Sequence, residues 1–201
     1  IQSIDAGDYQ LGTVQSDVLA YAWEGTRSFE SEGAIDSFRV VAGLYAEAVQ
    51  LITMDPEIKS VADLAGKSVS IGAPGSGVYF NAVDVLAAAG LTENDINAQY
   101  QSFADSTDAL KDGKIDAAFI VAGAPTPAIT ELCTTNDAYL VPIDGEIAEK
   151  IMADCPFYTA HTIPAGTYAG QDADVQTVTV KATLIVDAAA NEDDVYNLTK
   201  A

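Results

Sequence analysis

A Gly- and Ser-rich loop between a predicted strand and a predicted helix is the feature of this sequence best suited to chemistry. A short β-rich run at 68–71 is followed by Gly-Ala-Pro-Gly-Ser-Gly at 72–77, and a helical pattern starts at once. The first backbone N–H groups of a helix have no intrahelical partner, and the helix dipole makes that end positive. Such an end binds anions, carboxylates as readily as phosphates. The sequence therefore indicates an anion site at Gly75, Ser76 and Gly77, in which the unpaired N–H groups of Ser76 and Gly77 receive a carboxylate. A plain strand-to-helix turn is the alternative.

This loop matches neither nucleotide-binding fingerprint. A P-loop requires a Lys after the glycines, and the dinucleotide fingerprint requires G-x-G-x-x-G spacing, and both are absent. Ser76 could cap the helix, donate its hydroxyl to a ligand carboxylate, or do both. We therefore expect no nucleotide and no other cofactor here.

The charge balance limits the possible partners. Nine cations against 30 carboxylates give a formal net charge of −21, which argues against nucleic acid or an anionic membrane surface as partner. No run of 18 apolar residues occurs, so we expect no insertion into a membrane. The sequence opens on Ile1 instead of Met, which is compatible with removal of an N-terminal leader.

The cysteines and the single histidine do not predict a metal or catalytic centre. Cys133 and Cys155 are not in a metal-type spacing with each other or with His161. Buried free thiols and a disulfide formed in an oxidising compartment are both compatible with the sequence. A catalytic Cys–His pair is rejected, because no third group is placed to orient His161.

Strand and helix patterns alternate along the chain, which predicts an α/β fold with right-handed β-α-β units and parallel sheets. Strands are predicted at 9–16, 38–45 continuing through 49–53, 68–71, 100–103, 115–122, 139–143 and 178–186. Helices are predicted at 1–5, 17–23, 60–66, 78–90, 106–113, 128–134, 145–153 and 192–201.

In open sheets of this kind, ligands bind beyond the carboxyl ends of the strands. Those ends carry residues that are mostly small or polar, with free backbone groups: Gln15, Ser16, Asp17, Tyr45, 72–77, Ser102, Phe103, Ala122, Gly123, Ala124 and Pro125. The set suits a small solute and lacks a matched acid–base pair. Gly123 and Pro125 precede a helix, so a second group of free N–H donors is expected to face Gly75–Gly77.

Three further side chains have positions that the sequence predicts individually. Tyr45 is expected either at the floor of a ligand cleft or in the core. Trp23 is expected in the core, and Asn81, one turn into the helix after the loop, is expected to face solvent.

Several motifs together resemble the TAXI-type solute receptors of TRAP transporters. They lie at 42–45, 63–77, 109–119, 121–125, 140–144, 156–158 and 162–168, and the resemblance runs over essentially all 201 residues. It implies a type II periplasmic-binding-protein fold, in which two α/β domains joined by two crossing strands close on a solute. It further implies an extracytoplasmic receptor for glutamate, glutamine or a related acid, which delivers the solute to a sodium-driven TRAP permease in the membrane.

One part of the family's pattern is absent from this sequence. Receptors of this family begin with a strand and a T-G-G-T-G-G-x-Y-Y-like run, whereas this chain begins at the helix before Gln15 and Ser16. The resemblance favours Gln15 and Ser16 as solute contacts. We therefore expect a first domain, 1–51 with 176–201, that is incomplete at both ends and leaves an exposed sheet edge. Residues 52–175 are expected to form the second domain.

Two other functional classes share this fold, namely ligand-sensing regulators and enzymes. An enzyme would place a paired acid and base, or a metal cluster, among the strand-end residues, and that set has neither. A regulator would carry a fused DNA-binding or kinase module. Both classes stay open as alternatives, and we expect a solute-binding protein without enzymatic activity.

Overall fold

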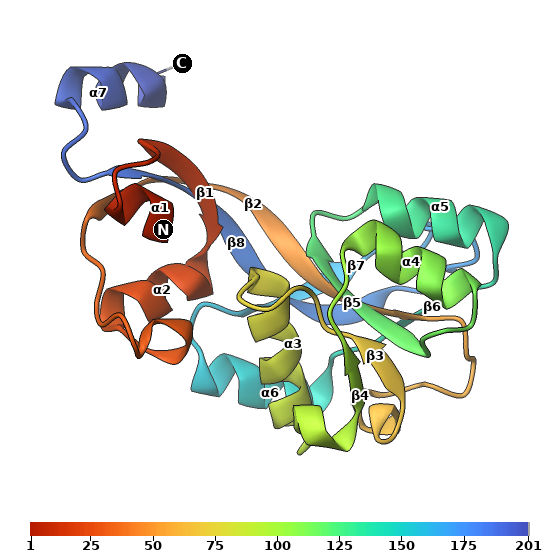
Figure 1. The fold of residues 1–201 in the computed structure, drawn as a ribbon. Coiled ribbons are helices and arrows are strands. Elements are labelled where there is room, and N and C mark those ends of the chain that lie inside the picture. The colour runs from red at the N-terminus through yellow and green to blue at the C-terminus, as the bar shows by residue number, and fades with distance from the viewer. Residues whose placement is uncertain (201) are drawn as a thin grey trace. The chain divides into compact units, whose positions relative to one another are not determined.

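A computed structural model describes residues 1–200 (Figure 1). The strands are β1 Leu11–Gln15, β2 Phe38–Thr53, β3 Ser68–Ser70, β4 Asn97–Gln99, β5 Ala117–Ala122, β6 Tyr139–Val141, β7 Thr159–Ile163 and β8 Val175–Asp187. The α-helices are α1 Gln2–Asp5, α2 Ser16–Glu24, α3 Gly77–Ala88, α4 Phe103–Lys111, α5 Pro127–Thr135, α6 Gly145–Asp154 and α7 Glu192–Lys200. Short 3-10 turns are η1 Arg27–Phe29, η2 Val61–Leu64 and η3 Glu93–Asp95.

The chain divides into two compact units. One contains residues 1–46 and 180–201, and the other contains residues 47–179. The chain passes from one unit to the other within β2 and again within β8. The expectation of two domains with breaks near 51/52 and 175/176 stays a prediction, because compact packing does not show that each unit folds independently.

The unit of residues 47–179 is built on a mixed sheet. β3 runs parallel to β4 on one side and to β5 on the other, with Val69 opposite both Ala98 and Ala117. β2 is antiparallel to β5, with Ala48 opposite Ala122. The expectation of parallel strands is therefore confirmed for β3, β4 and β5, and it was wrong for β2. The connection from β2 to β3 contains only the short turn η2. Two parallel strands are usually joined by a crossover helix, so a connection without an α-helix suits a β2 that runs opposite to β3 and β5.

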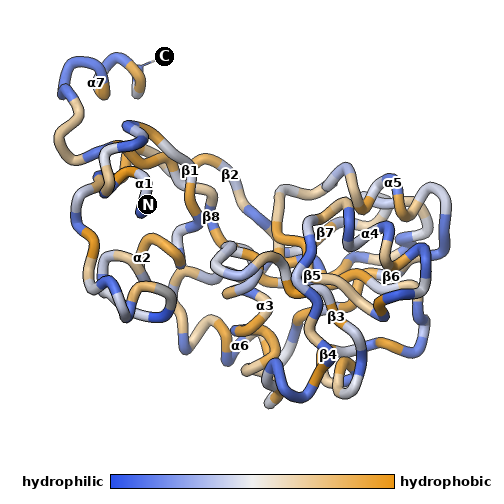
Figure 2. The backbone as a smooth tube through the Cα atoms, in the orientation of Figure 1, coloured by the Kyte–Doolittle hydropathy of each residue, from blue (hydrophilic) through white to orange (hydrophobic). Residues whose placement is uncertain are grey.

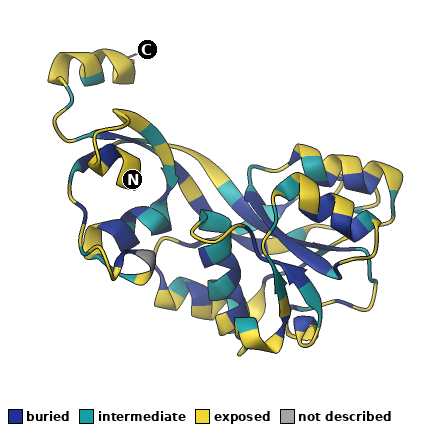
Figure 3. Ribbon diagram, viewed as in Figure 1, coloured by how far each residue is buried: buried dark blue, intermediate teal, exposed yellow. Residues whose placement is uncertain are grey.

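Helices cover this sheet on both sides. α3 packs with α6, and α4 packs with α5, and Figure 1 shows the two pairs on opposite faces of the strands. Because both faces are covered, β5 is apolar along its whole length and buried from Ala117 through Val121 (Figure 3). The hydropathy colouring in Figure 2 shows the same concentration of apolar residues in the central strands.

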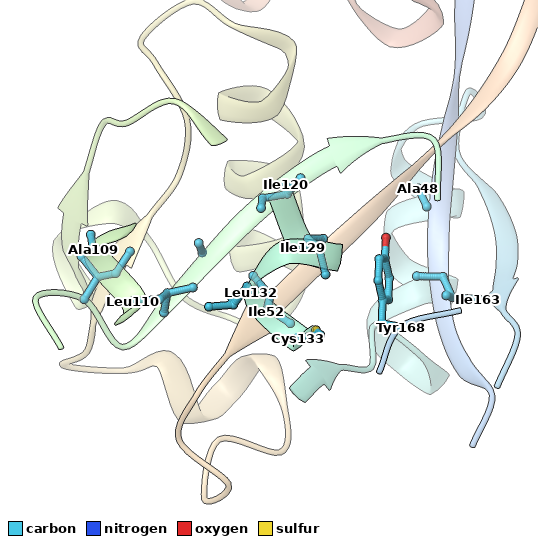
Figure 4. Packing of buried hydrophobic residues seen from close by; sticks show 12 residues of the cluster. Ala48, Ile52, Ala109, Leu110, Ile120, Ile129, Leu132, Cys133, Ile163 and Tyr168 are labelled. Atoms are coloured by element: carbon cyan, nitrogen blue, oxygen red, sulfur yellow. The ribbon is translucent and has the colours of Figure 1, made fainter. Parts of the chain in front are cut away.

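A hydrophobic cluster joins β2 and β5 to the α4–α5 side of the sheet (Figure 4). Its buried members are Ala48, Ile52, Ala109, Leu110, Ile115, Ala118, Ile120, Ile129, Leu132, Cys133, Ile163 and Tyr168. Tyr168 comes from the loop between β7 and β8, so the cluster also fixes that loop to the sheet.

Two local predictions in this unit were wrong. The strand expected at 100–103 lies at β4 instead, because Ser102 is the N-cap of α4 and its Oγ accepts a hydrogen bond from the Asp105 N–H at 3.2 Å. β7 was not predicted at all. Its residues are mostly exposed or half-buried, so it lacks the hydrophobic signal of a core strand, and its pairing with β8 is what defines it.

The unit of residues 1–46 and 180–201 contains the pairing of β1 with β8. The two strands are antiparallel, with Leu11 opposite Val186, and β1 ends the strand order, so it is an edge strand.

The core position predicted for Trp23 was wrong. Its side chain is 55% exposed, and its ring lies nearly perpendicular to that of Phe38, with 6.0 Å between the ring centroids. In residues 1–200, no helix has the length and apolar character needed to cross a membrane.

Candidate functional site

The loop before α3 is a tight turn that places Ser76 as the helix N-cap. The Ser76 N–H donates to the Ala73 carbonyl oxygen at 3.0 Å, and Gly75 has a φ of +77°. Proline at the second position and glycine with positive φ at the third position are typical of a type II β-turn. The Ser76 Oγ accepts a hydrogen bond from the Tyr79 N–H at 3.2 Å, which confirms the predicted cap.

The turn changes which N–H groups are free at the start of α3. The sequence predicted that the Ser76 N–H would be unpaired, and this was wrong, because that N–H closes the turn. The N–H groups of Gly77 and Val78 have no acceptor among the described residues. α3 has 12 residues, so these two donors lie at the positive end of a full-length helix dipole.

Gly72 brings the loop close to the first turn of α3. Its φ is +81°, and a Cβ at this position would lie 2.8 Å from the Cβ of Val78. A side chain at residue 72 would therefore push the loop away from the helix start. By contrast, a Cβ at Gly75 would meet no atom within 4 Å, so only the backbone conformation requires glycine there.

A second loop, 122–126, starts at the last residue of β5 and leads into α5. Ala124 and Pro125 are exposed at its tip, whereas Thr126 at its base is buried. Thr126 is the N-cap residue of α5 and Pro127 is its first helical residue, as expected for this helix start. Within residues 1–200, no acceptor takes up the N–H groups of Gly123 and Ala124.

The strand order brings these two loops to the same edge of the sheet. β3 and β5 are parallel neighbours, so the loop 72–77 and the loop 122–126 both leave the sheet at its carboxyl edge. β4 is parallel to β3, so Ser102 follows at this edge too. The structure thus brings the predicted residues Gly75–Gly77 and Ala122–Pro125 to one edge. Their role as solute contacts stays a prediction.

The remaining predicted contacts belong to the other unit. Gln15 is buried and pairs with Ala182, and the Ser16 Oγ accepts a hydrogen bond from the Lys181 N–H at 3.1 Å. Tyr45 lies in β2 and is 55% exposed, so the core alternative was wrong for this residue. That Gln15, Ser16 and Tyr45 contact a solute also stays a prediction.

Cationic side chains do not supply the positive charge at the carboxyl edge. Neither 72–78 nor 122–127 contains Lys or Arg. Lys111 pairs with Glu131 at 3.1 Å and with Asp108 at 3.2 Å, and these hydrogen bonds raise its pKa. Lys114 pairs with Asp112 at 2.7 Å. The donors that these two loops offer to an anion are therefore backbone amides and the Ser76 hydroxyl.

A buried polar group on α3 was missed. Asn81, expected to face solvent, is fully buried, and its Nδ2 donates to the Tyr158 hydroxyl at 2.6 Å. That hydroxyl donates in turn to Asp84 Oδ2 at 3.1 Å. Because α3 packs against α6 on one side, its polar residues there need partners. The i,i+3 spacing of Asn81 and Asp84 could have indicated that both lie on one face of α3. No feature of the local sequence identified Tyr158 as their shared partner.

A second polar group links α3 to the region around β4. Glu93 accepts hydrogen bonds from the Tyr79 hydroxyl at 2.8 Å and from the Tyr100 hydroxyl at 3.1 Å. The bond to the Glu93 carboxylate raises the pKa of Tyr79 to about 12. The neutral Tyr79 hydroxyl thus links the first turn of α3 to Glu93.

Both thiols lie in the interior of the protein. Cys133 and Cys155 are both buried and not disulfide-bonded, and burial raises the pKa of the Cys133 thiol. A raised pKa keeps a thiol protonated and weakly nucleophilic. In the part of the chain that the structure describes, no group of three or more His, Cys, Asp or Glu residues could hold a metal ion.

The comparison with known proteins gives a family and a fold. The model of the NMT1-like family matches residues 1–201. The structure of the periplasmic aliphatic sulphonate binding protein SsuA from Escherichia coli is similar, with TM-score 0.57 and 18% identity over 99% of this chain and 54% of that one. The structure of the alkanesulfonate-binding protein SsuA from Xanthomonas axonopodis pv. citri, bound to MOPS, is also similar. Its TM-score is 0.53, with 21% identity over 93% of this chain and 50% of that one.

An ancestral arginine-binding protein bound to arginine gives a TM-score of 0.55 and 14% identity over 99% of this chain and 66% of that one. At these identities, the similarity shows the fold alone. The chain has the mixed α/β fold of periplasmic binding proteins, and it spans between one half and two thirds of the length of these three proteins.

Proposed function

The chain belongs to the NMT1-like family, and on this premise we propose that the whole protein is an extracytoplasmic receptor for a small carboxylate solute. The solved proteins that share its fold are named as periplasmic or substrate-binding proteins, which supports solute binding over catalysis. The sequence motifs that resemble TAXI receptors support glutamate, glutamine or a similar acid as the solute. They also support a TRAP-type permease as the membrane partner.

The observation that carries this proposal is the carboxyl edge of the sheet in residues 47–179. Two loops from neighbouring parallel strands leave the N–H groups of Gly77, Val78, Gly123 and Ala124 without acceptors in the described part of the chain. A hydrogen bond to a charged acceptor contributes about 1.5–3 kcal/mol, and the α3 dipole favours a negative charge at its N-terminus. A carboxylate, with two oxygens and one charge, matches such an arrangement of donors.

Calorimetry on the whole protein tests this function. We expect binding of glutamate or glutamine with a dissociation constant in the micromolar range or tighter, roughly −8 kcal/mol. Arginine and taurine serve as comparison ligands, because the solved relatives are named for arginine and sulfonates. Binding of taurine with no heat from any carboxylate would replace the proposed solute class, and binding of a sugar alone would contradict the anion site.

The transport partner needs its own test. We expect the whole protein to stimulate sodium-driven uptake of its solute into vesicles that contain a TRAP permease. Uptake that instead depends on ATP and an ABC permease would keep the solute-binding function and overturn the TRAP assignment.

Ser76→Ala is expected to weaken solute binding about tenfold, which corresponds to about 1.4 kcal/mol. The substitution removes the Oγ that caps α3 and the hydroxyl proton available to a carboxylate. Loss of the cap should also lower the free energy of unfolding by about 0.5–2 kcal/mol. Calorimetry and urea unfolding measure the two effects.

Ser60→Ala is the matched control for this substitution. Ser60 caps η2 in a capping box with Asp63, on the amino side of β3. The Ser60→Ala variant should lose about as much stability as Ser76→Ala does, and it should keep wild-type affinity for the solute. Equal affinity for Ser76→Ala and wild type would show that Ser76 acts only as a cap.

A further inference from the structure

A buried ring of hydrogen bonds fixes the base of the loop after β5. The Tyr168 hydroxyl donates to Gln50 Oε1 at 2.5 Å and accepts from the Thr126 N–H at 2.8 Å. The Gln50 Nε2 donates to the Thr126 Oγ1 at 2.9 Å, and that Oγ1 donates to the Gly123 carbonyl oxygen at 2.9 Å. The three side chains thus tie β2, the loop after β7 and the N-cap of α5 together.

The donors and acceptors in this ring are fully consistent. The hydroxyls of Tyr168 and Thr126 each donate once and accept once, and the amide of Gln50 uses its oxygen and its nitrogen in opposite directions. All three side chains are buried. A buried polar network with every member satisfied is rigid, because loss of any member leaves another polar group unpaired in a low-dielectric environment.

Tyr168 is itself held firmly in place. Its ring lies in the hydrophobic cluster with Ala48, Ile129 and Ile163 (Figure 4). Gln171 secures the surrounding loop, because its Nε2 donates to the carbonyl oxygens of Ile163 and Ala173, both at 3.1 Å. Burial raises the pKa of the Tyr168 phenol, which keeps the donated proton in place.

The ring restrains both ends of the short loop segment that it spans. It binds the carbonyl of Gly123 at one end and the N–H of Thr126 at the other, so the intervening segment cannot rotate freely. The N–H groups of Gly123 and Ala124 are not used by the ring and have no acceptor in the described residues. Preorganised donors bind an anion more tightly than mobile ones, because their ordering entropy is already lost.

From this arrangement we propose that Tyr168 is a positioning residue for solute binding, which acts through Thr126 to hold the Gly123 and Ala124 N–H groups ready for the solute anion. This inference rests on the proposed function. It assigns a role to a residue that lies 42 positions from Thr126 in the sequence and whose hydroxyl is bonded to Thr126 and Gln50.

Tyr168→Phe in the whole protein tests the proposal, because it removes one hydroxyl and keeps the ring. We expect affinity for glutamate or glutamine to fall about tenfold. In the solute-free protein, the backbone ¹⁵N order parameters of Gly123 and Ala124 should fall from about 0.85, typical of rigid backbone, toward about 0.6. Thr126→Val should have the same effects by breaking the ring elsewhere, and Thr126→Ser should restore wild-type behaviour.

Thr53→Val is the matched control. The Thr53 Oγ1 is also buried, donates to the Asp116 carbonyl oxygen at 2.6 Å and accepts from the Asp55 N–H at 3.0 Å. Thr53 is the last residue of β2 and lies opposite Ala117, at the amino end of β5 and away from the carboxyl edge. The Thr53→Val variant should be less stable than wild type. It should keep the wild-type affinity for the solute and the wild-type order parameters of Gly123 and Ala124. An equal loss of affinity in Thr53→Val would reduce the role of Tyr168 to general stability.

The outcomes separate this inference from the proposed function. Wild-type affinity together with unchanged order parameters in Tyr168→Phe and Thr126→Val would overturn the positioning role. If the wild-type protein binds none of the carboxylates, the proposed function fails. The order parameters of Gly123 and Ala124 then decide alone whether Tyr168 holds the loop.

Discussion

Gly75→Pro is expected to abolish solute binding by the whole protein, with a fall in affinity of at least about a hundredfold, or about 2.7 kcal/mol. Gly75 has a φ of +77° in the turn that ends at Ser76. Proline fixes φ near −65°, so the turn from Ala73 to Ser76 cannot form. The start of α3 and the donors of Gly77 and Val78 would then lose their position. Calorimetry with glutamate or glutamine measures the loss.

Two controls separate the turn from general destabilisation. In Gly75→Ala, the added Cβ meets no atom within 4 Å, and the only cost is the strain of an alanine at positive φ. This variant should therefore bind the solute nearly as tightly as wild type does. Gly66→Pro imposes the same conflict at a φ of +73° and also removes the Gly66 N–H bond to the Asp95 carbonyl oxygen at 2.7 Å. It should be less stable and still bind. Retained binding in Gly75→Pro would refute the role of the turn.

Phe119→Ala is expected to lower the free energy of unfolding by about 3–5 kcal/mol, the range for truncating a buried aromatic residue. Phe119 is 1% exposed and lies in β5, where it faces Leu51 of β2 across the strand pair. The loss combines the removed apolar surface with the cavity that packed neighbours cannot fill. Urea unfolding should show a lower midpoint with an unchanged m value.

Phe157→Ala makes the same chemical change at a position that is 40% exposed in the same unit. It should lower stability by no more than about 1 kcal/mol, because partly solvated side chains leave small cavities or none. Similar losses for the two variants would show that β5 is not the centre of this core.

Local structure at the candidate site was largely predictable from the sequence. The Gly- and Ser-rich run placed the loop, and Ser76 was correctly predicted as an N-cap because capping depends on residues within one helical turn. The fate of the Ser76 N–H was missed, although Pro74-Gly75 is a type II turn signal whose hydrogen bond takes up the N–H of the fourth residue.

Contacts between distant parts of the chain could not be predicted. Asn81 is buried because Tyr158, 77 positions later, accepts its hydrogen bond. Tyr168 reaches Gln50 across 118 positions. Periodicity describes which face of an element is apolar, but it does not identify a polar partner from another element. The antiparallel direction of β2 beside β5 was missed for a similar reason, because strand direction depends on the route of the whole chain.

The central claim is that backbone amides at the carboxyl edge receive the anion of the solute, and amide NMR of the whole ¹⁵N-labelled protein tests it most directly. During titration with the carboxylate that binds in calorimetry, the account predicts that the amide protons of Gly77, Val78 and Gly123 shift downfield and saturate at the same dissociation constant. Saturable binding in calorimetry, with these three resonances unmoved, would contradict it.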